Sequence, residues 1–300
     1  MKPLFTMMAG LPGSGKSTKA QELAQEYNAT IFSSDSLREE MFGDVNHQAD
    51  NTKLFEELHR RIKDCLKDGK NAIYDATNIN YKRRMAFINE LSNIPCHKLC
   101  YLMAVPYEEC LKRNESRERK VPNHVIERMY RQFNIPYWYE GWDNIYIEYG
   151  EFYGCYDYPS VFYEDNAYYN QNNSHHTLTL GRHCESVAAS LFLDGNKLEL
   201  LYAGMIHDCG KPFCATFKNK KGEVTDECHY YDHQYVGAYR ALFYNYKNQC
   251  NSIEVAILVM WHMQPYFNKE EKTKEKYRKL WGEQLYNDIM KLHEADENAH

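Results

Sequence analysis

Gly10-Leu-Pro-Gly-Ser-Gly-Lys-Ser-Thr18 is the stretch that decides the fold of the first half of this chain. It follows an apolar run, Leu4 to Ala9, that predicts a buried strand, and it leads into a segment from Lys19 to Tyr27 that predicts a helix. The stretch therefore matches the pattern G-x-x-x-x-G-K-[ST] in the strand–loop–helix context of a phosphate-binding loop. An ordinary glycine-rich turn does not need all the fixed positions and both flanks. We expect this protein to bind ATP or GTP.

Each fixed position of the loop has a chemical reason. Glycines let the backbone point its N–H groups at phosphate oxygens, and the start of the following helix adds a favourable dipole. Lys16 can reach the β- and γ-phosphates, and Ser17 can hold Mg²⁺. The expected nucleotide-binding residues of the loop are Gly13, Ser14, Gly15, Lys16, Ser17 and Thr18.

Length and composition favour a globular protein of about two domains. The chain has 300 residues, of which 43% are hydrophobic and 26% are charged. Its longest apolar runs, such as Val255 to Trp261, are too short to span a bilayer, and no charged-then-apolar signal segment opens the chain. The ten cysteines form no Cys-x-x-Cys pair, so reduced thiols are expected. We expect a cytoplasmic protein of a bacterium or a phage-infected host, with no membrane partner.

The two halves of the sequence follow different patterns. Residues 1–150 alternate short apolar runs with helical segments, which predicts an α/β domain with a parallel sheet flanked by helices. Residues 151–172 are rich in tyrosine and predict an irregular connector. Residues 173–300 predict an all-α domain, apart from a possible hairpin around Lys221-Gly222. The expected strands are Leu4–Ala9, Thr30–Ser33, Asn71–Tyr74, Leu99–Ala104 and Asn144–Ile147, and the last expected helix is Lys274–Asn298.

Polar residues follow two of the expected strands. Asp35 and Arg38 come after the second strand, and Asp75 closes the third. Because the carboxyl ends of parallel strands face the ligand crevice, Asp35 would lie near the γ-phosphate and could accept a proton from an attacking hydroxyl. Arg38 could grip an anionic acceptor. Asp75 could support the metal or orient a basic side chain.

Basic residues gather in a segment that is typical of a lid. Arg113, Arg117, Arg119 and Lys120 are followed by Pro122, and such a lid could carry arginines onto the phosphate that is transferred. The first 150 residues carry equal numbers of acidic and basic side chains, so the whole net charge of −6 lies in the second half. An acidic protein needs local basic patches to hold nucleic acid. The two candidates are Lys82–Arg84 and Lys112–Lys120.

Together these motifs resemble the 5′-hydroxyl polynucleotide kinases of phage and bacterial end-healing enzymes. The resemblance covers residues 1–150 and rests on the phosphate-binding loop, Ser34-Asp-Ser-Leu-Arg38, Asp75-Ala-Thr-Asn78 with Arg83-Arg84, and Lys112-Arg-Asn-Glu-Ser-Arg117, in that order. It implies that Asp35 is the general base and that Arg38 contacts the phosphate on the 3′ side of the acceptor nucleotide. It also implies that Arg117, and more weakly Arg113, contact the donor phosphates, and that Asp75 is a required acid.

Histidines dominate the polar chemistry of the second half. Nine of the thirteen histidines lie between His175 and His300, and one of them forms an adjacent pair, His207-Asp208, before Lys211. Imidazole and carboxylate ligands without thiolates suit Mn, Fe, Co, Ni or Zn. A metal bound by such a set generates hydroxide near neutral pH. The sequence therefore predicts a site for one or two divalent transition metals.

The order of these residues resembles the HD phosphohydrolase superfamily, an all-helical fold. The strings that carry the resemblance are Thr177-Leu-Thr-Leu-Gly-Arg-His183, His207-Asp-Cys-Gly-Lys-Pro212, His229-Tyr-Tyr-Asp-His233 and Trp261-His-Met-Gln-Pro265. The resemblance implies His183, His207, Asp208 and Asp296 as core ligands, His233 and His262 as ligands of a second metal, and Lys211 as the residue that binds the scissile phosphate. The roles of the remaining histidines stay open: His175 and His176 could donate to the leaving group or have a cap or surface role, and His229 could contact substrate or lie on a loop.

A 5′-kinase joined to a metal phosphohydrolase predicts an enzyme that heals nucleic-acid ends, RNA being favoured over DNA. It would phosphorylate 5′-hydroxyl ends with ATP and Mg²⁺, and remove a 3′-phosphate or a 2′,3′-cyclic phosphate, so that a ligase could act downstream. One alternative is a nucleoside or nucleotide kinase fused to an HD nucleotidase. Another is a nucleotide sensor that binds metal without hydrolysis, against which the complete His/Asp set and Lys211 argue. The sequence leaves the oligomeric state open.

Overall fold

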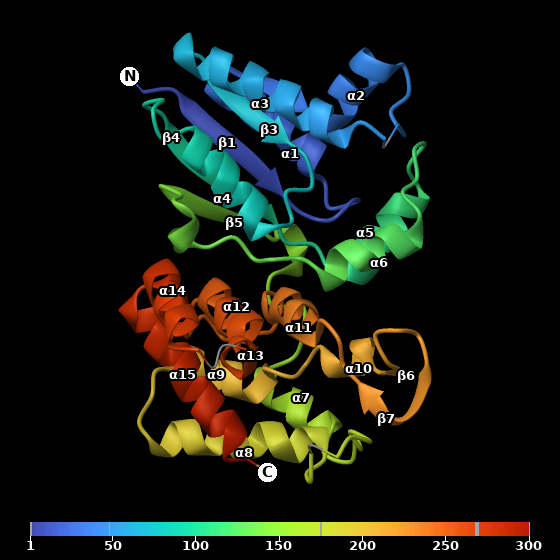
Figure 1. Cartoon of the computed structure of the whole chain (residues 1–300), viewed down its shortest axis with the longest axis vertical. Helices are drawn as coiled ribbons and strands as arrows, with labels where there is room; N and C mark the ends of the chain where they lie inside the picture. Colours follow the sequence, from blue (N-terminus) through green and yellow to red (C-terminus); the bar gives the residue numbers. More distant parts are fainter. Residues whose placement is uncertain (1, 48, 175, 268–269, 300) are drawn as a thin grey trace. The chain divides into compact units, whose positions relative to one another are not determined.

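The computed structural model describes residues 2–47, 49–174, 176–267 and 270–299. The chain divides into two compact units (Figure 1). The first contains the residues up to Glu127 together with Pro136–Gly150, and the second contains Arg128–Ile135 together with the residues from Glu151 on. Helix α6 (Asn123–Arg131) therefore contributes residues to both units.

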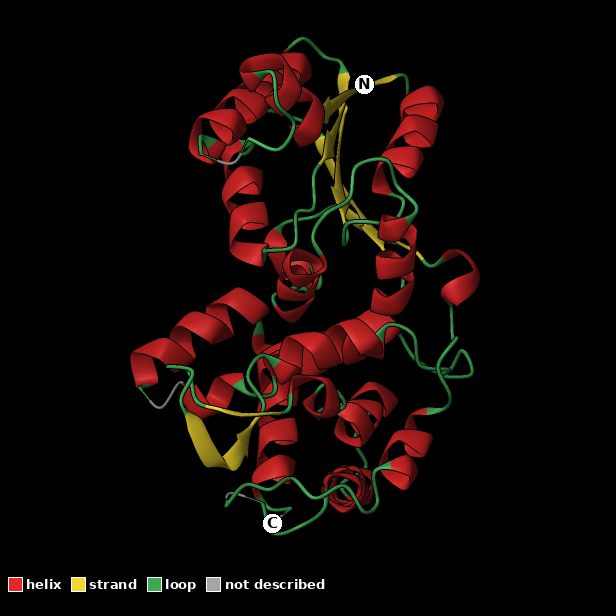
Figure 2. Ribbon diagram, turned by 90° about the vertical axis from the view of Figure 1, so that its right-hand side faces the viewer, coloured by secondary structure: helices red, strands yellow, loops and turns green. Residues whose placement is uncertain are grey.

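The first unit is built on one parallel sheet with helices on both faces (Figure 2). The strand order is β2-β3-β1-β4-β5, and every neighbouring pair is parallel. This confirms the expected α/β class. The strands are β1 (Leu4–Ala9), β2 (Ala29–Ser33), β3 (Asn71–Asp75), β4 (His97–Met103) and β5 (Asn144–Glu148). The helices are α1 (Lys16–Tyr27), α2 (Ser34–Phe42), α3 (Asn51–Lys67), α4 (Tyr81–Glu90), α5 (Tyr107–Glu115) and the start of α6.

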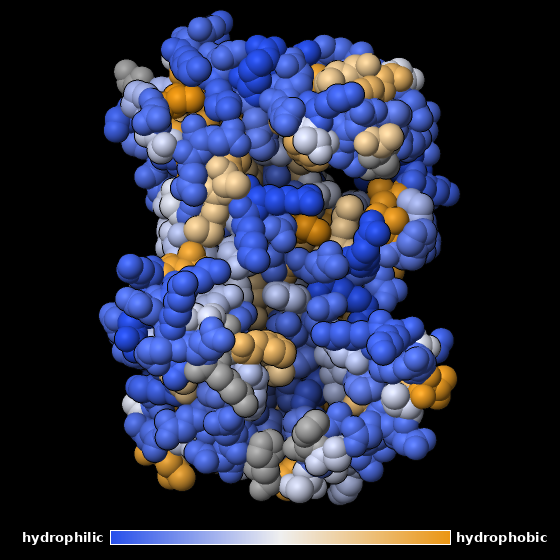
Figure 3. All heavy atoms as spheres, viewed as in Figure 1, coloured by the Kyte–Doolittle hydropathy of each residue, from blue (hydrophilic) through white to orange (hydrophobic). Residues whose placement is uncertain are grey.

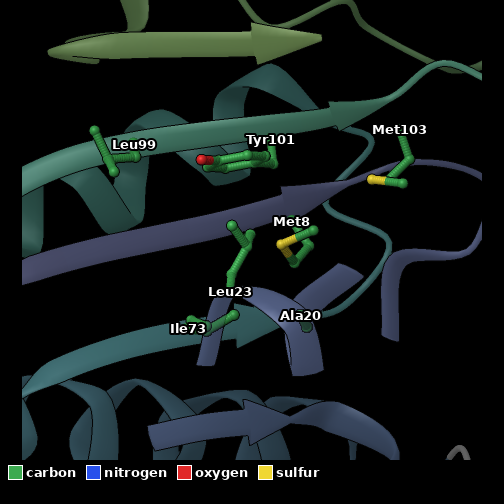
Figure 4. Packing of buried hydrophobic residues seen from close by; sticks show 7 residues of the cluster. All are labelled: Met8, Ala20, Leu23, Ile73, Leu99, Tyr101 and Met103. Carbon is green, nitrogen blue, oxygen red and sulfur yellow. The ribbon is translucent and has the colours of Figure 1, made fainter. Parts of the chain in front are cut away.

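The central strand β1 is buried on both faces, which explains its continuous apolar sequence. On one face Phe5 packs edge-on against Phe87, with ring centroids 5.4 Å apart. On the other face Met8 lies in a cluster with residues of α1 and the neighbouring strands (Figure 4). That cluster is Met8, Ala20, Leu23, Ile73, Leu99, Tyr101 and Met103. The packing fixes the end of β1, and with it the start of the phosphate-binding loop.

The second unit consists of helices and one short hairpin. Its most apolar helix, α12, is buried nearly all round, as its unbroken apolar sequence requires. The helices are α7 (Pro159–Asp165), α8 (Leu180–Leu193), α9 (Leu198–Ile206), α10 (Lys211–Cys214), α11 (His233–Ala241), α12 (Ser252–Trp261), α13 (Gln264–Phe267), α14 (Glu271–Trp281) and α15 (Glu283–Glu297). The hairpin pairs β6 (Thr216–Lys218) with β7 (Val224–His229), where the sequence predicts a possible hairpin.

Two expectations for the second half need correction. The single helix expected over Lys274–Asn298 is two helices, because Gly282 adopts φ +78° and separates α14 from α15. The connector expected to be irregular contains α7, and Tyr156 in it forms a parallel bridge to Tyr244. A proline at the first helical position starts α7, since its fixed φ suits a helix start.

The surface is mainly polar. On the face drawn in Figure 3, hydrophilic side chains predominate and hydrophobic ones are scattered. Within the part of the chain that the structure describes, no helix is long and apolar enough to cross a bilayer.

Candidate functional site

The loop between β1 and α1 requires glycine at its turns. Gly13 and Gly15 both have φ +85°, in the left-handed region that residues with a Cβ rarely adopt. A Cβ on Gly13 would also lie only 2.4 Å from the carbonyl oxygen of Cys110 in α5. The loop is thus packed against α5 as tightly as a glycine allows. Ser14 is buried within it, while Ser17 and Thr18 are exposed in the first turn of α1.

Lys16 is folded back onto its own loop. Its Nζ donates to the carbonyl oxygen of Leu11 at 2.8 Å and lies 3.5 Å from the Ser14 hydroxyl. Burial lowers the pKa of Lys16 to about 8, although the carboxylate of Asp75 acts in the opposite direction. The ammonium is therefore held in a poorly solvated place beside the loop, where phosphate oxygens would stabilise its charge.

Two acids lie at the carboxyl ends of neighbouring strands. Asp75 closes β3, where burial raises the pKa of its carboxyl, opposed by a hydrogen bond with Ser17 and by the charge of Lys16. Asp35 lies in the first turn of α2, directly after β2, with about half of its side chain exposed. Because the charge of Lys16 is influenced by both carboxylates, the three side chains share one electrostatic neighbourhood.

Asp35 is held by two arginines. Arg38 Nη1 lies 3.2 Å from one carboxylate oxygen, and Arg119 Nη1 lies 2.6 Å from the other. Arg38 is buried, and its Nη2 donates to Asn51 Oδ1 at 2.9 Å. Its buried Nε has no hydrogen-bond partner among the described residues. A buried donor without an acceptor is costly, so an anion beside Arg38 would be stabilised.

The lid arginines differ in what they contact. Arg117 is exposed, and its charge lowers the pKa values of Lys16 and Asp75, which places it in the same neighbourhood. Arg113 Nε instead donates to Glu109 on its own helix at 2.8 Å. Arg119 reaches from the lid to Asp35 and also donates to the carbonyl oxygen of Val45 at 3.1 Å.

One residue of an expected basic patch, Arg84, was wrongly assigned to the surface. Arg84 is only 1% exposed, and its guanidinium forms a two-point pair with Glu140, with both N–O distances 2.7 Å. Trp142 Nε1 donates to the same carboxylate at 3.0 Å. Arg84 therefore belongs to the core of the first unit and cannot contact nucleic acid, although its neighbours Lys82 and Arg83 are exposed.

In the second unit, five helices bring four histidines and two aspartates together. His183 lies on α8, and His207 and Asp208 follow the end of α9. His233 begins α11, His262 follows α12, and Asp296 lies in the last turns of α15. All six side chains are buried. The structure thus brings together every metal ligand that the sequence predicts for this half.

All four imidazoles use the same ring nitrogen, Nδ1, to contact the backbone. In each ring Nδ1 lies within hydrogen-bonding distance of a backbone carbonyl oxygen, which accepts a proton but cannot donate one. Each ring therefore carries its proton on Nδ1 and turns Nε2 toward the centre of the cluster. The Nδ1–O distances are 3.1 Å from His183 to Ala299, 3.0 Å from His207 to Gly204, 2.7 Å from His233 to Tyr230 and 2.7 Å from His262 to Val259.

Asp208 lies between two groups of ligands. Its Oδ2 is 3.3 Å from Nε2 of His207, and its Oδ1 is 3.2 Å from Nε2 of His233. The two groups are His183, His207 and Asp208, and Asp208, His233 and His262. Asp296 completes the first group, with Oδ1 2.9 Å from Nε2 of His183. This arrangement lets Asp208 bridge two metal ions.

The cluster requires positive charge at its centre. Nε2 of His183 and Nε2 of His207 are 3.1 Å apart, and those of His233 and His262 are 3.2 Å apart. Two lone pairs at such distances repel unless a proton or a metal cation lies between them. Burial would lower the pKa of His207, yet Asp208 and Asp296 raise it to about 10. Divalent metals bound by imidazole and carboxylate fit this donor set.

Lys211 lies beside the bridging carboxylate. Its Nζ is 2.6 Å from Asp208 Oδ2, donates to Gln171 Oε1 at 2.8 Å and lies 3.1 Å from Nε2 of His176. Burial and then the charge of Lys211 lower the pKa of His176 to about 4. His176 is therefore a neutral neighbour of Lys211, whereas His175 lies outside the described residues.

His229, whose role the sequence left open, does not reach the cluster. His229 lies on β7, where its Nε2 is 3.0 Å from the Thr225 hydroxyl and its ring stacks on Tyr231. Tyr266, which carries no motif, does contact the cluster, because its hydroxyl donates to Asp296 Oδ2 at 3.0 Å. Gln171 likewise enters the site without any signal in its sequence surroundings.

The match to a known protein family lies mainly in the first unit. A family model described as an AAA domain matches residues 5–136. L-seryl-tRNA(Sec) kinase of Methanococcus maripaludis is 26% identical over 145 residues, which are 47% of this chain and 56% of that protein. The first unit is a P-loop kinase-like domain. The matched residues 5–136 include the phosphate-binding loop, Asp35, Asp75 and the lid arginines.

Solved structures resemble the kinase-like domain only loosely. A chain of the Pnkp1/Rnl/Hen1 RNA repair complex is 25% identical, with 43% of each chain covered and a TM-score of 0.38. A sugar kinase from Janibacter is 14% identical, with 48% of this chain and 85% of that chain covered and a TM-score of 0.38. This chain spans about half the length of the seryl-tRNA kinase and less than half of the RNA repair chain.

Proposed function

We propose that this protein heals broken RNA ends. The kinase-like domain would transfer the γ-phosphate of ATP to a 5′-hydroxyl, and the second unit would remove the phosphate from the 3′ side of the break. The observation that carries the first activity is the placement of Asp35 and Arg38 at the carboxyl end of β2, in the electrostatic neighbourhood of Lys16. Lys16 alone would explain nucleotide binding, whereas Asp35 and Arg38 supply what a phosphate acceptor needs.

The transfer follows from the positions of these side chains. Backbone N–H groups of residues 13–18 and the Lys16 ammonium bind the β- and γ-phosphates, and the hydroxyl of Ser17 holds Mg²⁺. Asp35 accepts the proton of the 5′-hydroxyl. At the same time the 5′-oxygen forms a bond to the γ-phosphorus, the bond from that phosphorus to the β-phosphate oxygen breaks, and ADP leaves. Arg38 binds the phosphate on the 3′ side of the acceptor nucleotide, and Arg117 moves onto the donor phosphates.

The second activity rests on the buried cluster. His183, His207, Asp208 and Asp296 would hold one metal, and Asp208, His233 and His262 a second. A metal bound there would supply hydroxide near neutral pH by lowering the pKa of its water. Lys211 would bind the oxygens of the scissile phosphate, leaving Asp208 to the metals. The Nδ1 hydrogen bonds of the four histidines keep the rings oriented.

The two reactions are complementary in RNA repair. Many ribonucleases leave a 5′-hydroxyl and a 2′,3′-cyclic phosphate or a phosphomonoester, and ligases cannot join such ends. The similarity to an L-seryl-tRNA kinase supports an acceptor hydroxyl that is attached to RNA. A ligase acting on the healed ends is the partner that this activity calls for.

A smaller substrate is the alternative, and one observation favours it. The burial of Arg84 removes one of the three basic residues of the expected patch Lys82–Arg84, and the second half of the chain is acidic. A nucleoside kinase with an HD nucleotidase would need no extended basic surface.

An acceptor series distinguishes these functions. Phosphate transfer from ATP would be measured to a 5′-hydroxyl RNA trinucleotide, to a nucleoside 3′-monophosphate and to a plain nucleoside. We expect transfer to the first two, and an Arg38→Gln variant should lose most of that preference over the nucleoside. Equal transfer to all three acceptors, unchanged by Arg38→Gln, would support the nucleoside kinase instead.

A further inference from the structure

The second unit contains a cavity that the proposed metal site does not use. Its volume is about 380 Å³, within the range of sites for small ligands. Residues of α7, of the segment that precedes it and of α11 line it, together with Cys209, Pro212 and Phe213. These last three residues belong to the segment that also carries Asp208 and Lys211.

The decisive feature of this cavity is the charge of Arg240. The side chain lies at the end of α11 and is half-buried, and its buried Nε has no hydrogen-bond partner among the described residues. Within the part of the chain that the structure describes, the guanidinium forms no ion pair with a carboxylate. Its neighbours are instead the ring of Tyr156, 5.1 Å away, and the hydroxyl of Tyr244. A half-buried guanidinium whose buried Nε has no acceptor is unfavourable, unlike the guanidinium of Arg84, which pairs with Glu140.

The lining contains groups suited to the rest of a ligand. Tyr156 and Phe213 offer aromatic surfaces, and Asp157 and Asp165 offer carboxylates that accept hydrogen bonds from hydroxyl or amino groups. Inorganic phosphate alone would leave most of this volume and both carboxylates without a partner. A sugar or nucleoside that carries one phosphate matches the guanidinium, the carboxylates and the aromatic surfaces together.

We propose that this cavity is a second ligand site, in which Arg240 binds the phosphate of a nucleoside monophosphate and Tyr156 contacts its base or sugar. The site is separate from the His/Asp cluster, although Cys209 in its wall is adjacent to Asp208 in sequence. Occupancy of the cavity would therefore act on the segment that holds the bridging carboxylate and Lys211. No step of the proposed kinase or phosphatase reaction depends on it.

Cys155 provides a local measurement of occupancy. Its thiol is exposed and lines the cavity, whereas Cys65 lies in the kinase-like domain. The rate of alkylation of each thiol would be followed by peptide mass spectrometry in the full-length protein, with AMP, adenosine or inorganic phosphate added. We expect AMP to slow the alkylation of Cys155 several-fold at saturation, with adenosine and phosphate much weaker and Cys65 unaffected. Binding of AMP to the kinase-like site should leave the alkylation of Cys155 unchanged. Asp208→Ala separates binding at the metals from binding at the cavity, because it should leave the protection of Cys155 by AMP intact.

Variants test the assigned contact. Arg240→Gln should weaken the protection of Cys155 by AMP by about tenfold in concentration, because a charge-assisted contact to phosphate is lost. Arg182→Gln is the matched control, since Arg182 is an exposed arginine of α8 that pairs with Glu185. Protection that survives Arg240→Gln, or adenosine protecting as well as AMP, would overturn the proposal. Protection by inorganic phosphate at the same concentration as AMP would overturn the assignment of a nucleotide.

Discussion

Three side chains of the kinase-like site are held in positions that are energetically unfavourable unless a ligand binds beside them. The ammonium of Lys16 is buried against its own loop, Arg38 keeps an unpartnered buried Nε, and Asp35 remains half-exposed between two arginines. Such arrangements are unfavourable in the empty protein and become favourable when phosphates and an acceptor bind. The exposed carboxylate of Asp35 is the group that can receive a proton.

If Asp35 is the general base, a small substitution of its side chain should cause a large loss in the rate of phosphate transfer. Asp35→Asn keeps the size of the side chain and one oxygen that can accept from Arg38 or Arg119, but it cannot accept a proton at neutral pH. We expect the rate of phosphate transfer to fall by about 10²–10⁴-fold, the usual contribution of a general base. Binding of ATP, measured by calorimetry with Mg²⁺, should change little. A variant with wild-type transfer would exclude Asp35 as the base.

The buried pair of Arg84 and Glu140 stabilises the fold of the first unit. Both side chains are nearly inaccessible, so removing one partner leaves an uncompensated charge in the core. We expect Glu140→Gln to lower the free energy of unfolding by about 3–5 kcal/mol, measured by urea denaturation. Arg84→Met combined with Glu140→Leu should recover part of that loss, because no charge is then buried. A loss below about 1 kcal/mol for Glu140→Gln would mean that water reaches the pair.

Elements position the metal ligands through close contacts between helices. Gly210 lies directly before α10, and a Cβ there would be 2.1 Å from the carbonyl oxygen of His233 at the start of α11. Gly181 brings α8 equally close to Tyr163 of α7, with a corresponding distance of 2.1 Å. These contacts are made by backbone, which cannot move aside as a flexible side chain can.

Substitution of Gly210 should therefore act on the metal site through the helices. Gly210→Ala is expected to displace the start of α11, to lower the metal content of the purified protein and to abolish phosphatase activity, while 5′-kinase activity remains. Metal content would be measured by mass spectrometry of the elements. Gly222→Asn is the control, since Gly222 lies in a left-handed turn of the hairpin with nothing within 4 Å of its Cβ position. Wild-type metal content in Gly210→Ala would contradict this account.

Sequence patterns predicted the helices and strands well where one segment is buried along its whole length. The strands of the sheet lie within about two residues of their expected bounds. For the inner strands β1, β3 and β4 the reason is that a strand buried on both faces has an unbroken apolar run. The break at Gly282 was missed because the helical pattern of polar and apolar residues continues on both sides of it. Arg84 was misassigned because its partner Glu140 is 56 positions away, and sequence proximity to Arg83 indicated a surface patch.

In the candidate sites, too, the sequence predicts the residues that lie in motifs and misses those that only the tertiary fold brings in. Motif residues such as Lys16, Asp208 and His233 could be found because their chemistry fixes their spacing in the sequence. Gln171 and Tyr266 reach the sites only through tertiary folding and carry no such signal. Arg119 was expected in the lid, but its contact with Asp35 could not be found from the sequence. Whether each motif residue performs the proposed chemistry stays a prediction.

At the scale of the whole molecule, the two units carry different ligands and should respond to them separately. A metal that binds only the folded second unit stabilises it by about 2.7 kcal/mol at one hundred times its dissociation constant. Removal of metal with a chelator should therefore lower the melting temperature of that unit, and Mn²⁺ should restore it. ATP with Mg²⁺ should stabilise the kinase-like domain. An unchanged melting profile after removal of all metal would contradict the proposed metal centre.

The most direct test of the central claim uses one RNA with a 5′-hydroxyl and a 3′-phosphate, incubated with ATP, Mg²⁺ and Mn²⁺. The protein should add the 5′-phosphate and remove the 3′-phosphate. Asp35→Ala should lose only the first activity, and Asp208→Ala only the second. If the RNA stays unchanged while nucleosides or nucleotides are turned over, the proposal of RNA end healing is wrong.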